Sequence, residues 1–193
     1  LKGFPKGKFS SLRKIVKDFS EKDAREIKKI ERTTNHDVKA VEYFIKKKFA
    51  ALKLSKYEEF IHFGLTSQDI NNTSIPMSLK EGIEGELLPV LTNVITTLKS
   101  LSKEWERIPM LARTHGQPAS PTRLGKEIKV FVERLTVQLK HLNTIPYSAK
   151  FGGATGNFNA HKVAYPTINW VKFANSLVKG FGLKRSQTTT QIE

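Results

Sequence analysis

The chain has 193 residues, of which 38% are hydrophobic, enough to bury a core in one globular domain or two small ones. It contains no cysteine, which excludes a disulfide framework, a thiolate metal site and a cysteine nucleophile. No apolar run approaches the length of a membrane span, and the first residues lack the apolar core of a signal peptide. We therefore expect a cytoplasmic protein with no membrane partner.

The charge of the chain is strongly positive, with 33 basic and 18 acidic residues and a formal net charge of +15. A basic surface favours nucleic acid, because contacts with phosphates release counterions. Only eight of the basic residues are Arg, however, and scattered Lys, as in Lys46–Lys48, is typical of a solvated helix face. A positive field would equally steer a small substrate that carries phosphate and carboxylates. We expect no nucleic-acid partner, and a basic helical nucleic-acid-binding module remains an alternative.

Two helices are predicted near the amino end. Residues 9–16 show a short amphipathic pattern, and Ser20 opens a second helix in which Asp23 is placed to complete a capping box. The apolar pattern of this second helix ends at a polar break over residues 32–37.

Asn35, His36 and Asp37 lie in that break, and because apolar periodicity resumes at Val38, they stand at or just before a helix start. One interpretation is structural, with Asn35 or Asp37 as a helix cap. The other is that a histidine flanked by two acceptors, beside the positive end of a helix, is oriented toward an anionic ligand. The spacing does not choose between the two.

A second polar break begins at Thr66 and Ser67. Thr66 and Asp69 have the spacing of a capping box, which is a structural role. Two adjacent hydroxyls beside the amides of a helix start also make a good cradle for an anion. Both interpretations stay open here.

Two long helices are predicted in the middle of the chain. Apolar residues at steps of three and four run from Ile75 to Trp105, with a bend expected near Gly82, Gly85 and Pro89. A second pattern runs from Leu124 to Leu142, consistent with antiparallel packing against the first.

The stretch between these helices, residues 113–122, is predicted to be a shaped loop. Pro118 and Pro121 cannot continue a helix interior, and Gly116 lets the backbone approach a ligand or a partner strand closely. His115 is the only group of the stretch that titrates near neutrality. It is either an exposed histidine of a helix connection or a functional group.

A glycine-rich stretch, residues 148–159, follows the second long helix. No strand pattern precedes it and no GxGxxG occurs, so a dinucleotide or nucleotide-phosphate loop is excluded. What remains is a tight loop that carries Lys150 and Asn157.

A last helix is predicted from Ile168 to Phe181, with Gly182 as its C′ residue, and a polar tail ends the chain. The whole pattern indicates an all-α fold. We expect an N-terminal helical region over 1–74 and a long-helix region over 75–193.

The polar breaks resemble the adenylosuccinate lyase family, within the fumarase and aspartase superfamily. The resemblance runs from about Ser20 to the last residue and rests on five motifs in order. They are Glu31-Arg32-Thr33-Thr34-Asn35-His36-Asp37-Val38-Lys39-Ala40-Val41-Glu42-Tyr43-Phe44; Phe60-Ile61-His62-Phe63 with Thr66-Ser67-Gln68-Asp69-Ile70-Asn71-Asn72; Arg113 to Ala119; Gly153 to His161; and Thr189-Thr190-Gln191-Ile192-Glu193. It implies part of the superfamily's bundle of long helices.

The resemblance also implies a role for each matching residue. His115 matches the general acid that protonates the purine nitrogen as the succinyl group leaves. Thr66 and Ser67 match hydroxyls that hold a succinyl carboxylate. The other matches are substrate-binding positions: Asn35, His36, Asp37, Lys150, Asn157 and Gln191.

The reaction implied by the resemblance is β-elimination of fumarate from adenylosuccinate to give AMP, and from succinylcarboxamide ribotide (SAICAR) to give AICAR, in purine biosynthesis. It needs no metal or redox cofactor. The family assembles as a homotetramer with sites shared between subunits, so we expect the same here.

The departures from the family pattern predict that this chain is a fragment. It begins after the family's Arg-Tyr phosphate-binding segment and ends before the Gly-Ser-Ser-x-Met-Pro-x-Lys-x-Asn loop that supplies the serine base, and neither occurs within it. We therefore expect these 193 residues alone to be inactive. A non-catalytic relative that keeps the helical scaffold is a further alternative.

Overall fold

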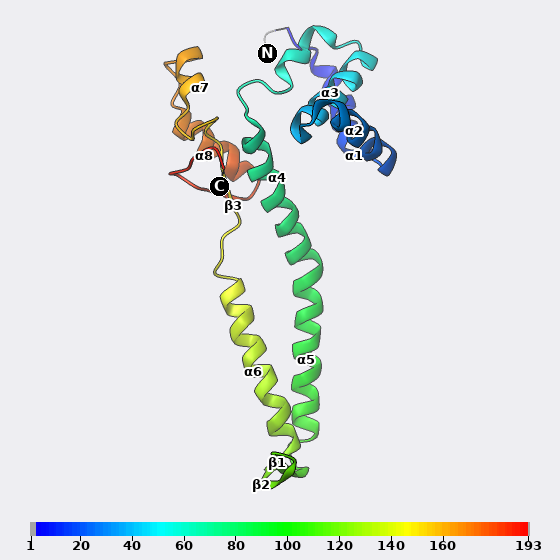
Figure 1. Ribbon diagram of the computed structural model, residues 1–193, viewed down its shortest axis with the longest axis vertical. Helices are drawn as coiled ribbons and strands as arrows, with labels where there is room; N and C mark the ends of the chain where they lie inside the picture. Colours follow the sequence, from blue (N-terminus) through cyan, green and yellow to red (C-terminus); the bar gives the residue numbers. More distant parts are fainter. Residues whose placement is uncertain (1–2, 193) are drawn as a thin grey trace. The chain divides into compact units, whose positions relative to one another are not determined.

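The computed structural model describes residues 3–192, and helices dominate this part of the chain, which confirms the all-α class. Figure 1 gives the order of the elements. They are α1 (Phe9–Lys17), α2 (Glu21–Thr34), α3 (Asp37–Ala51), α4 (Ser67–Gly82), α5 (Leu88–Glu104), β1 (Pro109–Thr114), β2 (Gln117–Arg123), α6 (Leu124–Leu142), β3 (Ser148–Ala149), α7 (Asn159–Ala164), α8 (Trp170–Gly180) and β4 (Lys184–Arg185). Within residues 3–192 no helix combines the length and the apolar character needed to cross a bilayer.

These residues divide into two compact units. The first contains 3–74, 149–180 and 185–192, and the second contains 75–148 and 181–184. The division expected from the sequence, 1–74 and 75–193, stays a prediction. It has the same boundary after residue 74, but the units group the segments 149–180 and 185–192 with the amino-terminal helices.

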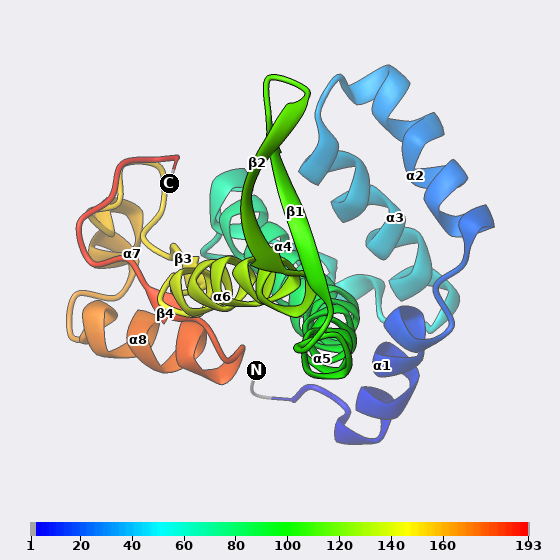
Figure 2. The same ribbon diagram turned by 90° about the horizontal axis from the view of Figure 1, so that it is seen from below.

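The predicted capping box starts α2 in the first unit. Ser20 Oγ accepts the Asp23 N–H at 3.3 Å, and Asp23 Oδ2 accepts the Ser20 N–H at 3.0 Å. Helices α2 and α3 lie side by side, as Figure 2 shows. Val38, Ala40 and Phe44 from α3 are buried and form part of the core of this unit.

The lysine run Lys46–Lys48 on α3 is engaged with carboxylates. The ammonium–carboxylate distances are 3.2 Å for Lys46 with Glu42, 3.1 Å for Lys46 with Glu59, 2.8 Å for Lys47 with Glu26 and 2.8 Å for Lys48 with Asp23. A face whose cations already contact carboxylates is poorly suited to bind a chain of phosphates.

Helices α5 and α6 pack against each other in the second unit and run antiparallel, as predicted (Figure 1). Their backbones come close at Gly125, where a Cβ atom would lie 2.3 Å from the Ser102 carbonyl oxygen. Ser102 Oγ donates to the Gly125 carbonyl at 2.8 Å. The glycine therefore permits a contact between the two backbones that a side chain would block.

The helix predicted to begin at Ile75 begins earlier, at Ser67, and passes through a π-helical turn at Ile83–Leu87 into α5. Its first turns are polar, so an apolar pattern does not reveal them. The π turn falls where the bend was predicted, near Gly82, Gly85 and Pro89. Pro89 has no N–H, so it cannot bond to the Gly85 carbonyl four residues earlier. The Leu88 N–H bonds to the Ile83 carbonyl, five residues back, which is the spacing of a π-helix.

The predicted shaped loop is a two-stranded antiparallel hairpin, which corrects the expectation of a loop. Strand β1 pairs with β2, with Pro109 opposite Arg123 and Thr114 opposite Gln117. Pro118 and Pro121 are tolerated because each strand of a two-stranded sheet has a free edge that requires no N–H donor. The sequence did not predict these strands, because they contain prolines and lack the alternation of apolar and polar residues that is typical of a strand.

The last long helix, α8, begins at Trp170, two residues later than predicted, and the Asn169 Oδ1 atom accepts the Lys172 N–H at 2.9 Å. It ends at Gly180, and Gly182 has a φ of +70°. This confirms Gly182 as the C′ residue. The short helix α7 was not predicted.

Candidate functional site

His36 is the N-cap of α3, so the prediction that residues 35–37 lie at a helix start is confirmed. Helix α2 ends at Thr34, its C-cap Asn35 has a left-handed φ of 51°, and the chain then extends through His36. The His36 Nδ1 atom accepts the Lys39 N–H at 3.2 Å. A ring nitrogen that accepts carries no hydrogen, so the capping form of His36 is neutral with its hydrogen on Nε2.

Asp37, the first residue of α3, connects this motif to α4. Its Oδ2 atom accepts the Asn71 side-chain amide at 3.0 Å, and this bond, followed by the Val38 amide, lowers the pKa of Asp37. Its Oδ1 atom lies 3.3 Å from His36 Nδ1. Because Nδ1 accepts from Lys39, it cannot donate to Asp37 at the same time.

The first turn of α4 is held by Asp69. The Thr66 N–H and the Thr66 hydroxyl both donate to Asp69 Oδ2 at 3.0 Å. This is one half of the predicted capping box. In the other half the Asp69 N–H bonds to the Thr66 carbonyl at 3.0 Å instead of the hydroxyl.

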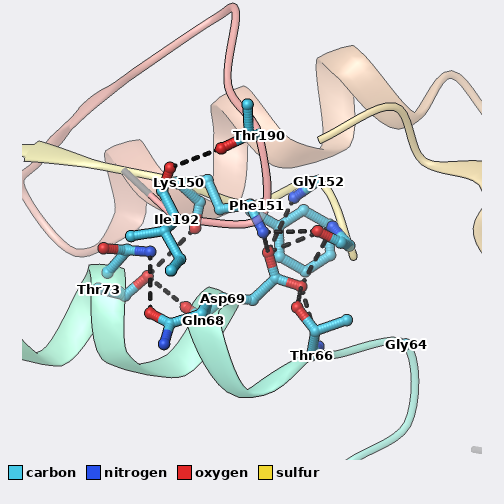
Figure 3. A network of polar contacts seen from close by, with 12 residues as sticks. Gly64, Thr66, Gln68, Asp69, Thr73, Lys150, Phe151, Gly152, Thr190 and Ile192 are labelled. Atoms are coloured by element: carbon cyan, nitrogen blue, oxygen red, sulfur yellow. Dashed lines mark hydrogen bonds and ion pairs between the residues drawn. The ribbon is translucent and has the colours of Figure 1, made fainter. Parts of the chain in front are cut away.

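Asp69 also binds the glycine-rich loop, through the Gly152 N–H at 3.0 Å and the Gly153 N–H at 3.2 Å. Its Oδ1 atom lies 2.9 Å from Lys150 Nζ. We call Asp69, Thr66, Lys150, Gly152 and Gly153 the Asp69 network, and Figure 3 shows the carboxylate at its centre. Burial alone would raise the pKa of Asp69, but the Thr66 amide, the Lys150 ammonium and the Gly152 amide together lower it.

Lys150, one of the expected substrate-binding residues, is fully buried. Its ammonium contacts Asp69 and donates to the Gly153 carbonyl at 2.6 Å. Its backbone N–H bonds to the Asn72 carbonyl at 3.4 Å. That carbonyl lacks an intrahelical donor because Pro76, four residues further along α4, has no N–H.

The last segment of the chain lies against the same loop. Gly156 has a φ of +80°, and a Cβ atom there would lie 2.2 Å from the Thr189 carbonyl oxygen. Figure 3 shows Thr190 and Ile192 beside the Asp69 network. Asn157 and Gln191 are both exposed, one in each of these adjoining segments.

His115 stands in the second unit, in the two-residue turn of the β1–β2 hairpin. Thr114 and Gln117 pair, so His115 and Gly116 are the two turn residues, with φ values of 49° and 76°. Positive φ at both positions is the geometry of a tight type I′ hairpin turn. The histidine is exposed, and the backbone alone fixes where its side chain begins.

The first unit thus gathers Asn35, His36, Asp37, Thr66, Ser67, Lys150, Asn157 and Gln191, whereas His115 belongs to the second. Their roles in binding and catalysis stay predictions. Within residues 3–192 no three His, Asp or Glu side chains converge into a potential metal site.

Sequence reasoning missed three contributors to the site. Asp69 was predicted only as a cap, and Asn71 only as part of a motif. His161 is buried, and its Nε2 atom lies 2.6 Å from the Gly64 carbonyl, just before Thr66. A histidine near the glycine-rich loop was the only sequence signal for this last contact.

A family model described as Lyase matches residues 6–193. The chain is 57% identical over 188 residues to the adenylosuccinate lyase of Dictyostelium discoideum, covering 94% of this chain and 40% of that protein. It is 50% identical over 181 residues to the adenylosuccinate lyase of Vibrio cholerae, covering 93% of this chain and 40% of that protein. The chain thus spans 40% of the length of these curated relatives.

Two solved structures share the fold. The fumarate lyase of Mesorhizobium sp. BNC1 superposes with a TM-score of 0.77 at 17% identity, over 96% of this chain and 42% of that one. The 3-carboxy-cis,cis-muconate lactonizing enzyme of Pseudomonas putida gives 0.73 at 22% identity, over 84% of this chain and 36% of that one.

Proposed function

Because this chain belongs to the lyase family, whose model spans residues 6–193, we propose that it serves β-elimination of fumarate from adenylosuccinate and from SAICAR, yielding AMP and AICAR. The identity to curated adenylosuccinate lyases carries the proposal. These 193 residues include no match to the family's serine loop, so we expect no fumarate release from them alone. Action in the cytoplasm stays a prediction.

In the proposed reaction a base removes a proton from the succinyl carbon next to a carboxylate. The electron pair forms the C=C bond of fumarate, the C–N bond breaks, and the nitrogen takes a proton. His115 supplies that proton, because an imidazole titrates near working pH.

Negative charge grows on the succinyl carboxylate as the proton leaves. Ser67 and the first amides of α4, which lack intrahelical partners, are suited to stabilise it. His36, Asn157 and Gln191 orient the ligand in this proposal.

A chimera tests the proposal. Residues 6–193 of this chain replace the matching segment of the Dictyostelium discoideum relative, and fumarate release is measured with each substrate. We expect turnover of both substrates at a rate comparable to that of the unaltered relative. A chimera that folds and assembles like the relative but releases no fumarate would refute the proposal.

We further propose that the protein is a homotetramer in which His36 and His115 of one site come from different subunits. Chimeras with His36→Ala and with His115→Ala, each nearly inactive, are mixed and allowed to exchange subunits. In a 1:1 population about a quarter of the sites receive both histidines, as expected for a closed symmetric assembly. If exchange is confirmed by mass and activity does not recover, the two histidines act within one chain.

A further inference from the structure

Arg185, in strand β4, is a buried cation that faces no carboxylate. The residue is 8% exposed, and no Asp or Glu among residues 3–192 forms an ion pair with its guanidinium. Burial lowers the pKa of Arg185, yet an arginine stays charged in a folded protein. A charge in such a place is costly unless polar groups satisfy it, so the contacts of Arg185 explain how it is accommodated.

The guanidinium of Arg185 donates to neutral acceptors on three segments. Its Nε atom donates to the Phe151 carbonyl at 3.4 Å, in the glycine-rich loop of residues 148–159. Its Nη1 atom donates to Asn175 Oδ1 of α8 at 3.1 Å and to Gln187 Oε1 at 2.9 Å. Gln187 belongs to the terminal segment, residues 186–192, and its own amide donates to the same Asn175 oxygen at 3.1 Å.

The same guanidinium packs against Phe158, the residue that follows Asn157. Its central carbon lies 5.3 Å from the centre of the Phe158 ring. Phe158 is buried and has a φ of 58°, a left-handed value that a bulky side chain seldom adopts and that persists only where the surroundings hold it. Arg185 is part of those surroundings, so it helps to fix the backbone from which the Asn157 side chain begins.

Arg185 also holds the segment that carries Gln191. Gln187 accepts its bond four positions before Gln191. Between the two, the Thr189 carbonyl lies against the glycine-rich loop. One buried side chain therefore contacts both of the segments that carry Asn157 and Gln191.

We propose that Arg185 is a positioning residue that joins the glycine-rich loop to the terminal segment, so that Asn157 and Gln191 reach the same ligand. Arg185 acts through these two side chains. The inference rests on the proposed function, because only that function makes Asn157 and Gln191 ligand-binding residues. The planar guanidinium suits the task, since a lysine has one nitrogen and cannot bond to three segments while it stacks on a ring.

Arg185→Lys in the chimera tests the role in binding, with Arg13→Lys, at an exposed arginine of α1, as the matched control. We expect Arg185→Lys to raise KM for adenylosuccinate about tenfold and to change kcat by less than about threefold, because the orienting contacts are lost equally in the ground state and the transition state. In an Asn157→Ala background the same change should raise KM by only about threefold, since one of the two side chains through which Arg185 acts is gone. Arg13→Lys should change neither constant.

A merely structural role predicts a different result. Arg185→Lys would then lower the melting temperature and leave KM of the folded enzyme unchanged, and this outcome would overturn the inference. A tenfold rise in KM that is the same with and without Asn157 would also overturn it.

Hydrogen exchange tests the joining of the two segments without turnover. We expect Arg185→Lys to speed exchange in residues 150–158 and 186–191 together by about tenfold or more, because both segments lose the same donor. Faster exchange in only one of them would overturn the inference. A chimera that releases no fumarate would refute the proposed function, and exchange in the two segments would still decide whether Arg185 joins them.

Gln187→Leu keeps the test decisive if Arg185→Lys does not fold. This change removes the side-chain bonds of the terminal segment and leaves Arg185 on Phe158. We expect faster exchange in residues 186–191, again by about tenfold, and no change in residues 150–158. Unchanged exchange in residues 186–191 would show that the bond to Arg185 does not hold the terminal segment.

Discussion

The Asp69 network and the β1–β2 hairpin hold their candidate site residues in opposite ways. Asp69 is buried among donors from two distant segments, and its neighbours are fixed by side-chain bonds. His115 is exposed at a two-residue turn, and only the backbone of the hairpin fixes it. The first arrangement couples stability to function, whereas the second separates them. Mutations should therefore change both properties at Asp69 and only one at His115.

The largest expected effect is on catalysis at the turn. His115→Asn in the chimera should lower kcat by about 10²- to 10⁴-fold, the usual contribution of a positioned general acid. Asn adopts left-handed backbone readily, so the melting temperature should not change. His141→Gln, at an exposed histidine of α6, is the matched control and should leave both quantities unaltered. A change confined to KM would make His115 a binding residue.

At the Asp69 network the expected effect is on folding. Asp69→Leu should lower the free energy of unfolding of the chain by about 3–5 kcal/mol, because Lys150 is left as a buried unpaired charge. Urea denaturation measures this loss. The double variant Asp69→Leu with Lys150→Met should recover part of it. A double variant no more stable than Asp69→Leu would show that the hydrogen bonds of Asp69, and not its charge, carry the effect.

The base of the hairpin offers an intermediate case. Gly125→Ala should destabilise the second unit by about 1–3 kcal/mol, since its Cβ atom would overlap the Ser102 carbonyl. Gly82→Ala is the control, because a Cβ atom there meets nothing within 4 Å and alanine favours the helix. Thermal unfolding should show opposite signs for the two variants. Equal changes in melting temperature would mean that α5 and α6 move apart enough at Gly125 to accommodate the added Cβ atom.

The smallest effect concerns the cap of α2. Bonds from Lys48, and then from Ser20, lower the pKa of Asp23 to about 2 from an ordinary value of 3.8. Because the folded-state pKa is the lower one, the carboxylate stabilises the fold above about pH 4 and loses this contribution as the pH falls through about 2. Asp23→Asn should therefore lower the melting temperature by a few degrees at neutral pH. The difference from the parent chain should shrink continuously below pH 4.

Local signals in the sequence predicted the fold well. The capping box of Ser20 and Asp23, the span of α6 and the C′ glycine at position 182 each depend on residues a few positions apart. The hairpin was not predicted, because its prolines and polar residues do not alternate with apolar ones as in a typical strand. These residues form strands because β1 and β2 pair with each other.

The sequence was enough to propose a candidate site as a set of residue types, but not to predict the contacts among them. The polar breaks between the apolar patterns are enough to select His36, Thr66 and His115 as candidates. The partners of Asp69 lie on a loop that no local pattern joins to α4. The sequence around Lys150 did not predict that its side chain is fully buried, because burial depends on how segments far apart in the chain pack together.

The separation between Asp69 and Gly152 has a consequence for the order of events during synthesis. The two residues lie 83 positions apart, so at usual elongation rates roughly 4 to 17 s pass between their incorporation into the growing chain. During that interval the carboxylate has Thr66 as a donor but lacks the amides of Gly152 and Gly153, which have not yet been made. Helices α5 and α6, whose contacts with each other are closer in sequence, can pair in the meantime. The first turn of α4 can therefore form early, but its bonds to the glycine-rich loop wait for a segment that is made after the long helical hairpin.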